Sequence, residues 1–237
     1  MSAPGRLYLL PAPLSEDTPP EGVVPRPVLE RIRTLGHFVV ENAKSARAWL
    51  RACAHPKPVR ELEIAELNEH TSAAAIPQLL APALAGHDLG LLSEAGMPGV
   101  ADPGAALVAA AHAHGVTVIP CVGPSSIVLA LAASGLEGQR FRFVGYLPAD
   151  AGGRREALLE LERRSARDRE TQVFIETPYR NDALLAEILK SCRGATRLAV
   201  AADITSARES ISMDTVAAWK KRAAVIGKRP AIFLLQA

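Results

Sequence analysis

The sequence of 237 residues is poor in cysteine and aromatic residues, and neither charge sign dominates it. Its three cysteines, Cys53, Cys121 and Cys192, are widely spaced and form no CxxC pair, which argues against a disulfide framework and a zinc ribbon. A formal net charge of +2 shows no global bias toward nucleic acid or anionic membranes, although it permits a local basic patch. No window approaches the ~18–20 apolar residues of a membrane helix, and the first apolar run is too short for a signal peptide. These absences favour a cytoplasmic protein without a membrane span.

Several catalytic and nucleotide-binding motifs are also missing. The chain has no GxxxxGK[ST] phosphate loop, no GxGxxG after its first apolar run, no HExxH and no GxSxG. His112 and His114 form an HxH pair, but that spacing places them on different faces of a helix, without acidic or cysteine partners. We therefore expect neither an ordinary dinucleotide fold nor a metal site.

What the sequence does contain is a regular alternation of short apolar runs and helical segments. This alternation is typical of α/β proteins with a mostly parallel sheet covered on both faces. The domain boundary is expected near residues 120–123, which gives domains 1–121 and 122–237. The expected strands are 6–10, 37–41, 58–67, 88–94, 116–123, 141–147, 171–177, 196–203 and 231–237. The expected helices are 25–36, 44–54, 72–87, 103–115, 124–135, 153–169, 181–192 and 212–223, with prolines at positions 77 and 82 near the start of the third helix or kinking it.

The stretch "LLSEAGMPGVADPG" concentrates special residues directly after an expected buried strand. Open α/β sheets place their ligands at this position. Gly96 and Gly99 permit positive φ and a close approach to the backbone, while Pro98 and Pro103 stiffen the loop. A second loop of this kind, "CVGPSS", follows the next strand. Chemistry alone leaves two interpretations open, a ligand-binding crevice and a pair of tight turns that bind nothing.

These same residues resemble the tetrapyrrole methylase superfamily of S-adenosylmethionine-dependent methyltransferases, and within it the bacterial enzymes that methylate a cytidine ribose 2′-oxygen in 16S ribosomal RNA. The family loop "SDAGTPxxSDPG" is matched by "SEAGMPGVADPG", and "GPxxxxxALxxxGL" by "GPSSIVLALAASGL". Further matches are "LYLLPAPL", "FRFVGYLPADAGGRR" and "FIETPYR". The resemblance extends from the first strand to the C-terminus.

The resemblance implies two α/β domains with mixed sheets, S-adenosylmethionine in the cleft between them, and a homodimer. The N-terminal domain would face the substrate, and the C-terminal domain would complete the cofactor cleft. The residues expected to bind the cofactor are Leu14, Gly96, Met97, Pro98, Val100, Ser125, Ser126, Ile175, Glu176, Ala201, Ala202, Pro230 and Ala231.

The chain departs from this family pattern mainly in its N-terminal segments. Relatives that modify ribosomal RNA have "IGNLxD" where this chain has "LSEDTPP", and their "AEDTR" is "VENAK" here, which keeps Glu41 and replaces Arg with Lys44. Their "HNE" survives as Asn68 and Glu69. Because these segments face the substrate side, the resemblance supports the cofactor better than it supports the acceptor.

Methyl transfer to a hydroxyl requires alignment of donor and acceptor and removal of a proton. The candidate catalytic residues are Glu41, Lys44, Glu69, Glu176 and Arg180. Asn68, Arg154 and Arg155 are candidates for substrate contacts, although the helix that the two arginines begin also fits a solvated surface helix with i,i+4 ion pairs. Three functions remain open: a ribosomal RNA ribose methyltransferase, a methyltransferase for a small metabolite such as a tetrapyrrole, and a cofactor-binding protein whose catalytic loops have eroded.

Overall fold

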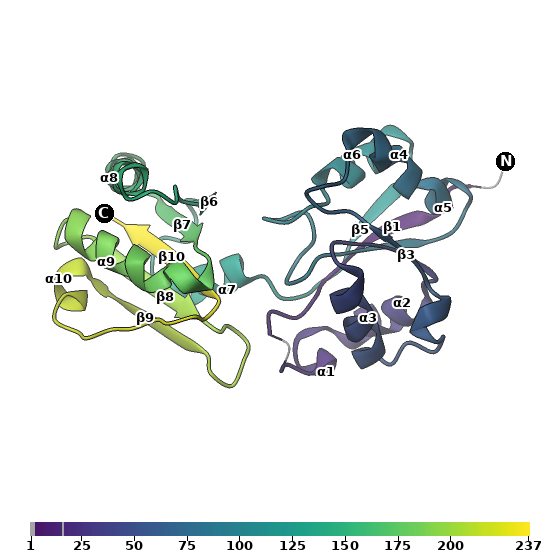
Figure 1. Ribbon diagram of the computed structural model, residues 1–237, viewed down its shortest axis with the longest axis horizontal. Coiled ribbons are helices and arrows are strands. Elements are labelled where there is room, and N and C mark those ends of the chain that lie inside the picture. The colour runs from purple at the N-terminus through teal and green to yellow at the C-terminus, as the bar shows by residue number, and fades with distance from the viewer. Residues whose placement is uncertain (1–2, 16) are drawn as a thin grey trace. The chain divides into compact units, whose positions relative to one another are not determined.

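The computed structural model describes residues 3–15 and 17–237, and the chain divides into two compact units, residues 1–125 and 126–237 (Figure 1). The division falls between Ser125 and Ser126. Each unit contains one five-stranded sheet with its own helices. We describe each unit by itself.

The N-terminal sheet has the strand order β3-β2-β4-β1-β5, and all four of its pairings are parallel. The mixed sheet implied by the resemblance is therefore wrong for this unit, although the α/β class is confirmed. Every strand-to-strand connection here passes through helical turns, which return the chain to the same end of the sheet. The strands are β1 (Arg6–Leu10), β2 (His37–Val40), β3 (Glu63–Glu66), β4 (Leu89–Leu92) and β5 (Thr117–Pro120).

Helices cover both faces of this sheet, because alternate residues of each strand point to opposite sides. In β2, Phe38 and Val40 pack with the helices α2 and α3, whereas Val39 packs with α4, α5 and α6. These helices are α1 (Pro20–Val23), α2 (Arg26–Thr34), α3 (Ala43–Ala52), α4 (Ile76–Leu79), α5 (Ala81–Leu84) and α6 (Ala105–Ala113).

The long helix expected over residues 72–87 is wrong, because the structure breaks it into a 3-10 turn (Ala73–Ala75), α4 and α5. Pro77 and Pro82 are each the second residue of a new helix. Proline has no N–H to donate and is tolerated only in the first turn, so each proline starts a helix and prevents a continuous one. The expected strand over residues 58–67 is likewise shorter, with a 3-10 turn (Val59–Glu61) before β3.

The C-terminal sheet is mixed, as the resemblance implies, with the strand order β6-β7-β10-β8-β9. The pair β6 and β7 is parallel, while β10 runs antiparallel to both of its neighbours and β9 runs antiparallel to β8. The strands are β6 (Phe141–Tyr146), β7 (Thr171–Ile175), β8 (Arg197–Ala202), β9 (Ser210–Thr215) and β10 (Ala231–Gln236).

The helix expected over residues 212–223 is mostly wrong. Its first part belongs to β9, which pairs along its full length with β8, and only the turn α10 (Val216–Trp219) is helical. Thr215 ends the strand and caps this turn, because its Oγ1 accepts a hydrogen bond from the Ala218 N–H at 3.2 Å. Sheet pairing therefore overrides the helical composition of the segment.

Helices also cover the C-terminal sheet. The helices α8 (Ala151–Asp168), α9 (Asn181–Ser191) and α10 pack on one face around Phe174 and Phe233, whose stacked rings are 5.8 Å apart. The helix α7 (Ser126–Ser134) lies against β8, β9 and β10. Among the described residues, no helix combines the length and apolarity that crossing a membrane requires.

Candidate functional site

The N-terminal unit presents its loops at the carboxyl edge of the parallel sheet. The strands β1 and β4 are neighbours, but the chain leaves β1 for β2 on one side of the sheet and leaves β4 for β5 on the other. Where neighbouring parallel strands lead in opposite directions, the loops after them separate and leave a crevice for a ligand. Both segments that the sequence singled out, Pro11–Leu14 and Ser93–Gly104, begin at this point.

The glycine-rich loop is bound to the segment after β1. The N–H groups of Ala12 and Gly96 each donate to the other residue's carbonyl, at 2.8 and 3.1 Å. Gly96 has φ +73°, and a β-carbon there would lie 3.3 Å from Leu14 Cδ2 and 3.6 Å from the Pro124 carbonyl oxygen. The structure therefore brings together Leu14, Gly96 and the loop that leads to Ser125. At Gly96 the close approach is made by the chain itself, as the tight-turn interpretation expects.

Gly99 differs from Gly96 in what surrounds it. Its φ is +80°, and the nearest atom to an added β-carbon is the Ala105 nitrogen at 3.8 Å. Pro98 is buried, Met97 is partly buried and Val100 is 51% exposed. Positive φ without an internal packing reason leaves this part of the loop free to receive a ligand against its backbone.

Three carboxylates gather at the same edge. Glu41, at the end of β2, accepts a hydrogen bond from the Glu94 N–H at 3.0 Å through Oε2. Burial first, and then the negative charges of Glu41 and Glu94, raise the pKa of Asp102 to about 6, against the opposing effect of a hydrogen bond from Ser93. Sequence reasoning missed Asp102 as a functional residue, although an acid inside a ligand-type loop could have indicated it.

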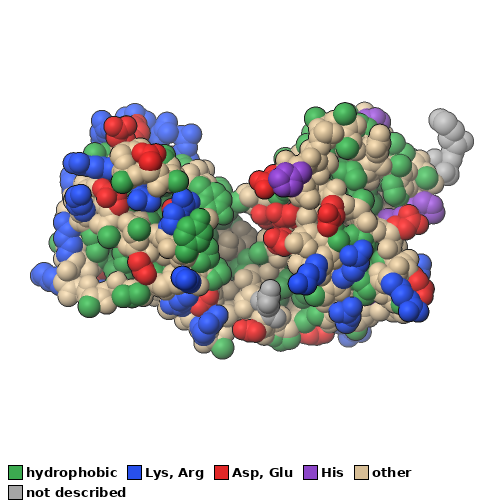
Figure 2. All heavy atoms as spheres, viewed as in Figure 1, with side chains coloured by type: hydrophobic (Ala, Val, Ile, Leu, Met, Phe, Trp, Pro, Cys, Tyr) green, Lys and Arg blue, Asp and Glu red, His purple; other side chains and the backbone are tan. Residues whose placement is uncertain are grey.

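A pocket of about 630 Å³ opens beside this loop, entirely within the N-terminal unit. It is enclosed by the segment after β1, the beginning of the glycine-rich loop and one face of α3. Leu14 and Lys44, both expected to be functional, contribute to its wall, together with Trp49, which sequence reasoning did not identify. Figure 2 shows acidic and basic side chains gathered in adjacent groups on this unit.

Asn68 and Glu69 lie in the loop after β3. The Asn68 side-chain oxygen accepts a hydrogen bond from the His70 N–H at 3.0 Å, which makes this residue a turn-former here. The Glu69 side chain is 86% exposed, and its nearest charged partner is His70 at 3.7 Å. The structure does not bring these two residues into the group formed by Glu41 and Asp102.

The expected cofactor residues of the C-terminal unit meet at one edge of its sheet. Ile175 pairs with Ile232 and Tyr146, and Ala202 pairs with Ala231. Since β10 runs antiparallel to β7 and β8, its beginning lies beside the ends of both strands. This register brings together Ile175, Glu176, Ala201, Ala202, Pro230 and Ala231, while Ser126 opens α7.

Glu176 is a buried carboxylate, and only one of its two oxygens accepts hydrogen bonds from described residues. Its side chain is fully buried, and its Oε1 accepts from Arg180 Nη2 at 2.7 Å and from the Thr177 N–H at 2.7 Å. Its Oε2 is buried and has no hydrogen-bond partner in the described part of the chain. Nearly all buried polar atoms in proteins are paired, so an unpaired carboxylate oxygen at this edge marks a position where a donor is expected.

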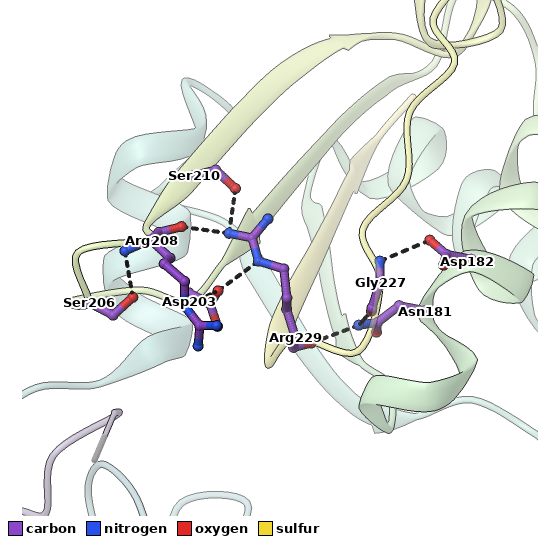
Figure 3. A network of polar contacts seen from close by, with 8 residues as sticks. All are labelled: Asn181, Asp182, Asp203, Ser206, Arg208, Ser210, Gly227 and Arg229. Atoms are coloured by element: carbon purple, nitrogen blue, oxygen red, sulfur yellow. Dashed lines mark hydrogen bonds and ion pairs between the residues drawn. The ribbon is translucent and has the colours of Figure 1, made fainter. Parts of the chain in front are cut away.

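A second buried ion pair, which sequence reasoning missed, holds the neighbouring strand ends (Figure 3). Arg229 Nε donates to Asp203 Oδ2 at 2.7 Å, and its Nη2 donates to the Arg208 carbonyl at 2.6 Å and to Ser210 Oγ at 2.9 Å. The Asp203 N–H donates to the Pro230 carbonyl at 3.0 Å. The pair therefore fixes Pro230 beside the end of β8. An acid directly after one strand and an arginine two residues before another were the available sequence signals.

Arg154 and Arg155 begin the helix α8 in different surroundings. Arg154 is buried and donates to the Ala149 carbonyl at 3.5 Å, whereas Arg155 is exposed. The preceding glycines serve the helix cap, because the Gly153 N–H donates to Asp150 Oδ1 at 2.7 Å and a β-carbon there would lie 2.9 Å from Asp150 Oδ2. Only Arg155 is exposed enough to reach a substrate.

Comparison with known proteins adds an independent finding. Residues 26–218 match the family Tetrapyrrole (Corrin/Porphyrin) Methylases. A ribosomal RNA small subunit methyltransferase I from Xylella fastidiosa is 31% identical over 227 residues, which is 94% of this chain and 77% of that protein. The protein of that name from Mycobacterium bovis is 32% identical over 218 residues, which is 91% of this chain and 73% of that protein.

Solved structures share the fold at lower sequence identity. The methyltransferase CobJ aligns with a TM-score of 0.64 and 20% identity over 98% of this chain and 94% of its own. The uroporphyrin-III-C-methyltransferase from Thermus thermophilus aligns with a TM-score of 0.55 and 19% sequence identity, over 98% of this chain and 94% of its own. The sheet topology, the glycine-rich loop and the sequence matches agree: the chain belongs to the tetrapyrrole methylase family.

Proposed function

We propose that this protein is an S-adenosylmethionine-dependent methyltransferase that modifies a ribose 2′-oxygen in small-subunit ribosomal RNA. The observation that carries the proposal is the similarity to ribosomal RNA small subunit methyltransferases over more than nine-tenths of the chain. The matched motifs include the loop after β4 and the strand end at Glu176, where each unit presents ligand-type geometry.

Features of both units fit the cofactor. In the N-terminal unit, Gly99 has positive φ and open space beside its α-carbon, so the backbone of Met97–Val100 can approach a ligand. In the C-terminal unit, the unpaired Glu176 Oε2 can accept from a ribose hydroxyl or an amino group. The further residues that would hold the cofactor are Leu14, Ser125, Ser126, Ile175, Ala201, Ala202, Pro230 and Ala231. When bound, S-adenosylmethionine supplies an electrophilic methyl group on a sulfonium sulfur.

The chain's own residues must align the acceptor hydroxyl and take up its proton. A base is most effective when its pKa lies near the working pH, and the Asp102 carboxyl, with its pKa of about 6, meets this condition. Glu41 keeps the Asp102 pKa high through its negative charge. Lys44, on the adjacent helix, can stabilise an oxyanion or a phosphate. We assign Asp102 the role of the base that accepts the proton of the acceptor hydroxyl, and Glu41 the role of helping to raise the pKa of Asp102.

The main alternative is methylation of a tetrapyrrole, which the family name and the two solved structures favour. The relatives with higher sequence identity carry the ribosomal RNA name, and this supports RNA over the macrocycle. The deciding experiment is mass spectrometry of ribosomal RNA from a strain that lacks the gene. Loss of one ribose methylation, restored by the wild-type gene, supports the proposal, and an unchanged modification pattern contradicts it.

We also propose a cytoplasmic homodimer. Family resemblance suggests the dimer, and exposed apolar side chains on α7 and β9, namely Val128, Leu129 and Met213, offer a surface that a second copy could cover. Light scattering at micromolar concentration should give twice the mass of one chain. A monomeric mass would contradict the assignment.

A further inference from the structure

The pocket beside α3 combines features that the cofactor assignment does not use. One helix face forms much of its wall, with Ser45, Ala48, Trp49 and Ala52 at the spacing of neighbouring helical turns. Ala48 and Ala52 are exposed and have short side chains, so they leave open space in the pocket, and Trp49 lines the pocket beside them. Its volume of about 630 Å³ is within the range of small-ligand sites.

Trp49 has an unsatisfied polar atom. Its side chain is buried, with the residue 8% exposed, and its indole Nε1 has no hydrogen-bond partner among the residues that the structure describes. The other tryptophan, Trp219, is equally buried but donates from Nε1 to the Leu198 carbonyl at 2.9 Å. A buried tryptophan N–H normally finds an acceptor, so Trp49, which packs in the core of this unit and also lines the pocket, carries an unpaired donor. Ser45 and Glu94 also line the pocket, and the Ser45 hydroxyl donates to Glu94 Oε1 at 3.3 Å.

A basic stripe runs along α3 next to this pocket. Lys44, Arg47 and Arg51 are exposed and lie at i, i+3 and i+7, which places them on one helix face adjacent to the pocket wall. Within residues 3–15 and 17–237, none of the three side chains has an ion-pair partner. By contrast, Arg26 of the helix α2 pairs with Glu30. Unneutralised cations at regular spacing beside an aromatic ring are the usual elements of a single-stranded nucleic acid site.

We propose that this pocket receives one unpaired base of the RNA acceptor, while Lys44, Arg47 and Arg51 bind the phosphates that flank it. The inference rests on the proposed RNA function and names the part of the chain that would hold the nucleotide. Sequence-specific recognition of RNA uses the unstacked bases of single-stranded segments, which are bound in pockets and stack on aromatic side chains. The pocket lies at the same sheet edge as Asp102, because both adjoin the loop after β4.

The base contact can be followed by tryptophan fluorescence, because the chain has only two tryptophans. In the full-length Trp219→Phe variant, Trp49 is the only tryptophan, and a single-stranded RNA fragment of the ribosomal target should quench its emission. In the matched Trp49→Phe variant, only Trp219 remains, and the same RNA should leave its emission unchanged. RNA that binds by an independent fluorescence-anisotropy measurement and fails to quench Trp49 would overturn the proposal.

Filling the pocket provides a second test that does not depend on Trp49. Ala52→Leu adds a side chain to an exposed wall position and should lower RNA affinity by about tenfold or more, the effect expected for one lost base-stacking contact. The control is Ala109→Leu, the same change on the exposed surface of α6, with unchanged affinity expected. Equal affinities for the two variants would overturn the base pocket.

The phosphate contacts predict a salt effect. Arg47→Gln and Arg51→Gln should each reduce the slope of log affinity against log salt by about one, whereas the control Arg26→Gln should leave it unchanged. Uroporphyrin binding to wild type that is lost in Ala52→Leu, with no RNA binding, would overturn the inference in favour of a macrocycle.

The result is separable from the proposed function. RNA methylation that persists in Ala52→Leu with normal affinity removes the pocket assignment alone. Absence of methylation in wild type, with Trp49 quenching retained, removes the activity and leaves the binding site.

Discussion

The two units differ in the burial and pairing of the charged groups at the edges of their sheets where ligands are expected. In the C-terminal unit, Glu176 and Asp203 are buried and each is held by an arginine that also contacts the backbone or a hydroxyl nearby. In the N-terminal unit, Lys44 and Glu94 are exposed, and Asp102 lies among other carboxylates. Buried, paired groups hold one geometry, whereas exposed groups can adjust to a partner.

This difference parallels the sequence. The motifs of the C-terminal unit match the family closely, and the departures are concentrated between β1 and the loop after β3. A rigid edge suits a ligand that all members share, and a variable edge suits a substrate that differs between members. The five predictions below test this contrast, beginning with the largest expected effect.

Arg180→Leu should destabilise the C-terminal unit by about 3 kcal/mol, because it leaves the fully buried Glu176 carboxylate without its cation. Urea unfolding followed by Trp219 fluorescence in a Trp49→Phe background measures this unit. The control is Arg26→Leu, which breaks the exposed pair with Glu30 and should cost less than about 0.5 kcal/mol. Equal unfolding midpoints for the two variants would show that the buried pair does not hold this edge.

Asp102→Asn should lower the methyl transfer rate by about 100-fold if this carboxylate accepts the proton, which corresponds to roughly 2.7 kcal/mol. The wild-type rate should rise with pH through about 6, because the charged carboxylate is the active form and its pKa is about 6. The variant should lose this rise. A variant that keeps the wild-type pH profile would exclude Asp102 as the base.

The same variant should have the opposite effect on stability. The Asp102 pKa is raised from 3.8 to about 6 in the folded protein, so the native state holds its proton more strongly than the unfolded chain. Stability from this group is therefore present below about pH 4 and is lost as pH rises to about 6. At pH 8, Asp102→Asn should be more stable than wild type by about 1 kcal/mol, after allowance for solvent screening of a partly exposed carboxylate.

Arg229→Ala should destabilise the C-terminal unit by about 2 kcal/mol, because it removes the cation from Asp203 and two further hydrogen bonds. Cofactor affinity should fall as well, since the pair fixes the strand ends around Pro230. Arg208→Ala is the control, because this side chain is 73% exposed and lies 3.7 Å from the same carboxylate. Calorimetry and urea unfolding on both variants would contradict the positioning role if they gave the same values.

Gly99→Ala and Gly115→Ala form a matched pair that tests the glycine-rich loop. Both glycines have positive φ, +80° and +69°, and neither has an atom closer than 3.8 Å to an added β-carbon. Each substitution should therefore cost about 1–2 kcal/mol of stability. Only Gly99→Ala should also weaken cofactor binding, by about tenfold or roughly 1.4 kcal/mol. Equal cofactor affinities for the two variants would support a loop that only turns the chain.

Prediction from sequence succeeded where the signal is local. The buried runs at Arg6–Leu10 and Leu89–Leu92 are strands as expected, because short apolar segments before glycine and proline can form little else. It failed at residues 212–223, whose first four residues belong to β9 and pair with β8. It also missed Trp49, because a tryptophan on an amphipathic helix is most often part of a core.

The sequence by itself determined the α/β class, the position of the glycine-rich loop after β4 and the family, since each depends on residues that are neighbours in the chain. Only the tertiary structure decided that Ala12 pairs with Gly96, that Arg229 neutralises Asp203 and that Trp49 borders a pocket. It also decided that the N-terminal sheet is parallel throughout its described strands. These features join segments separated by tens of residues, and the pKa of Asp102 depends on burial that no local pattern encodes.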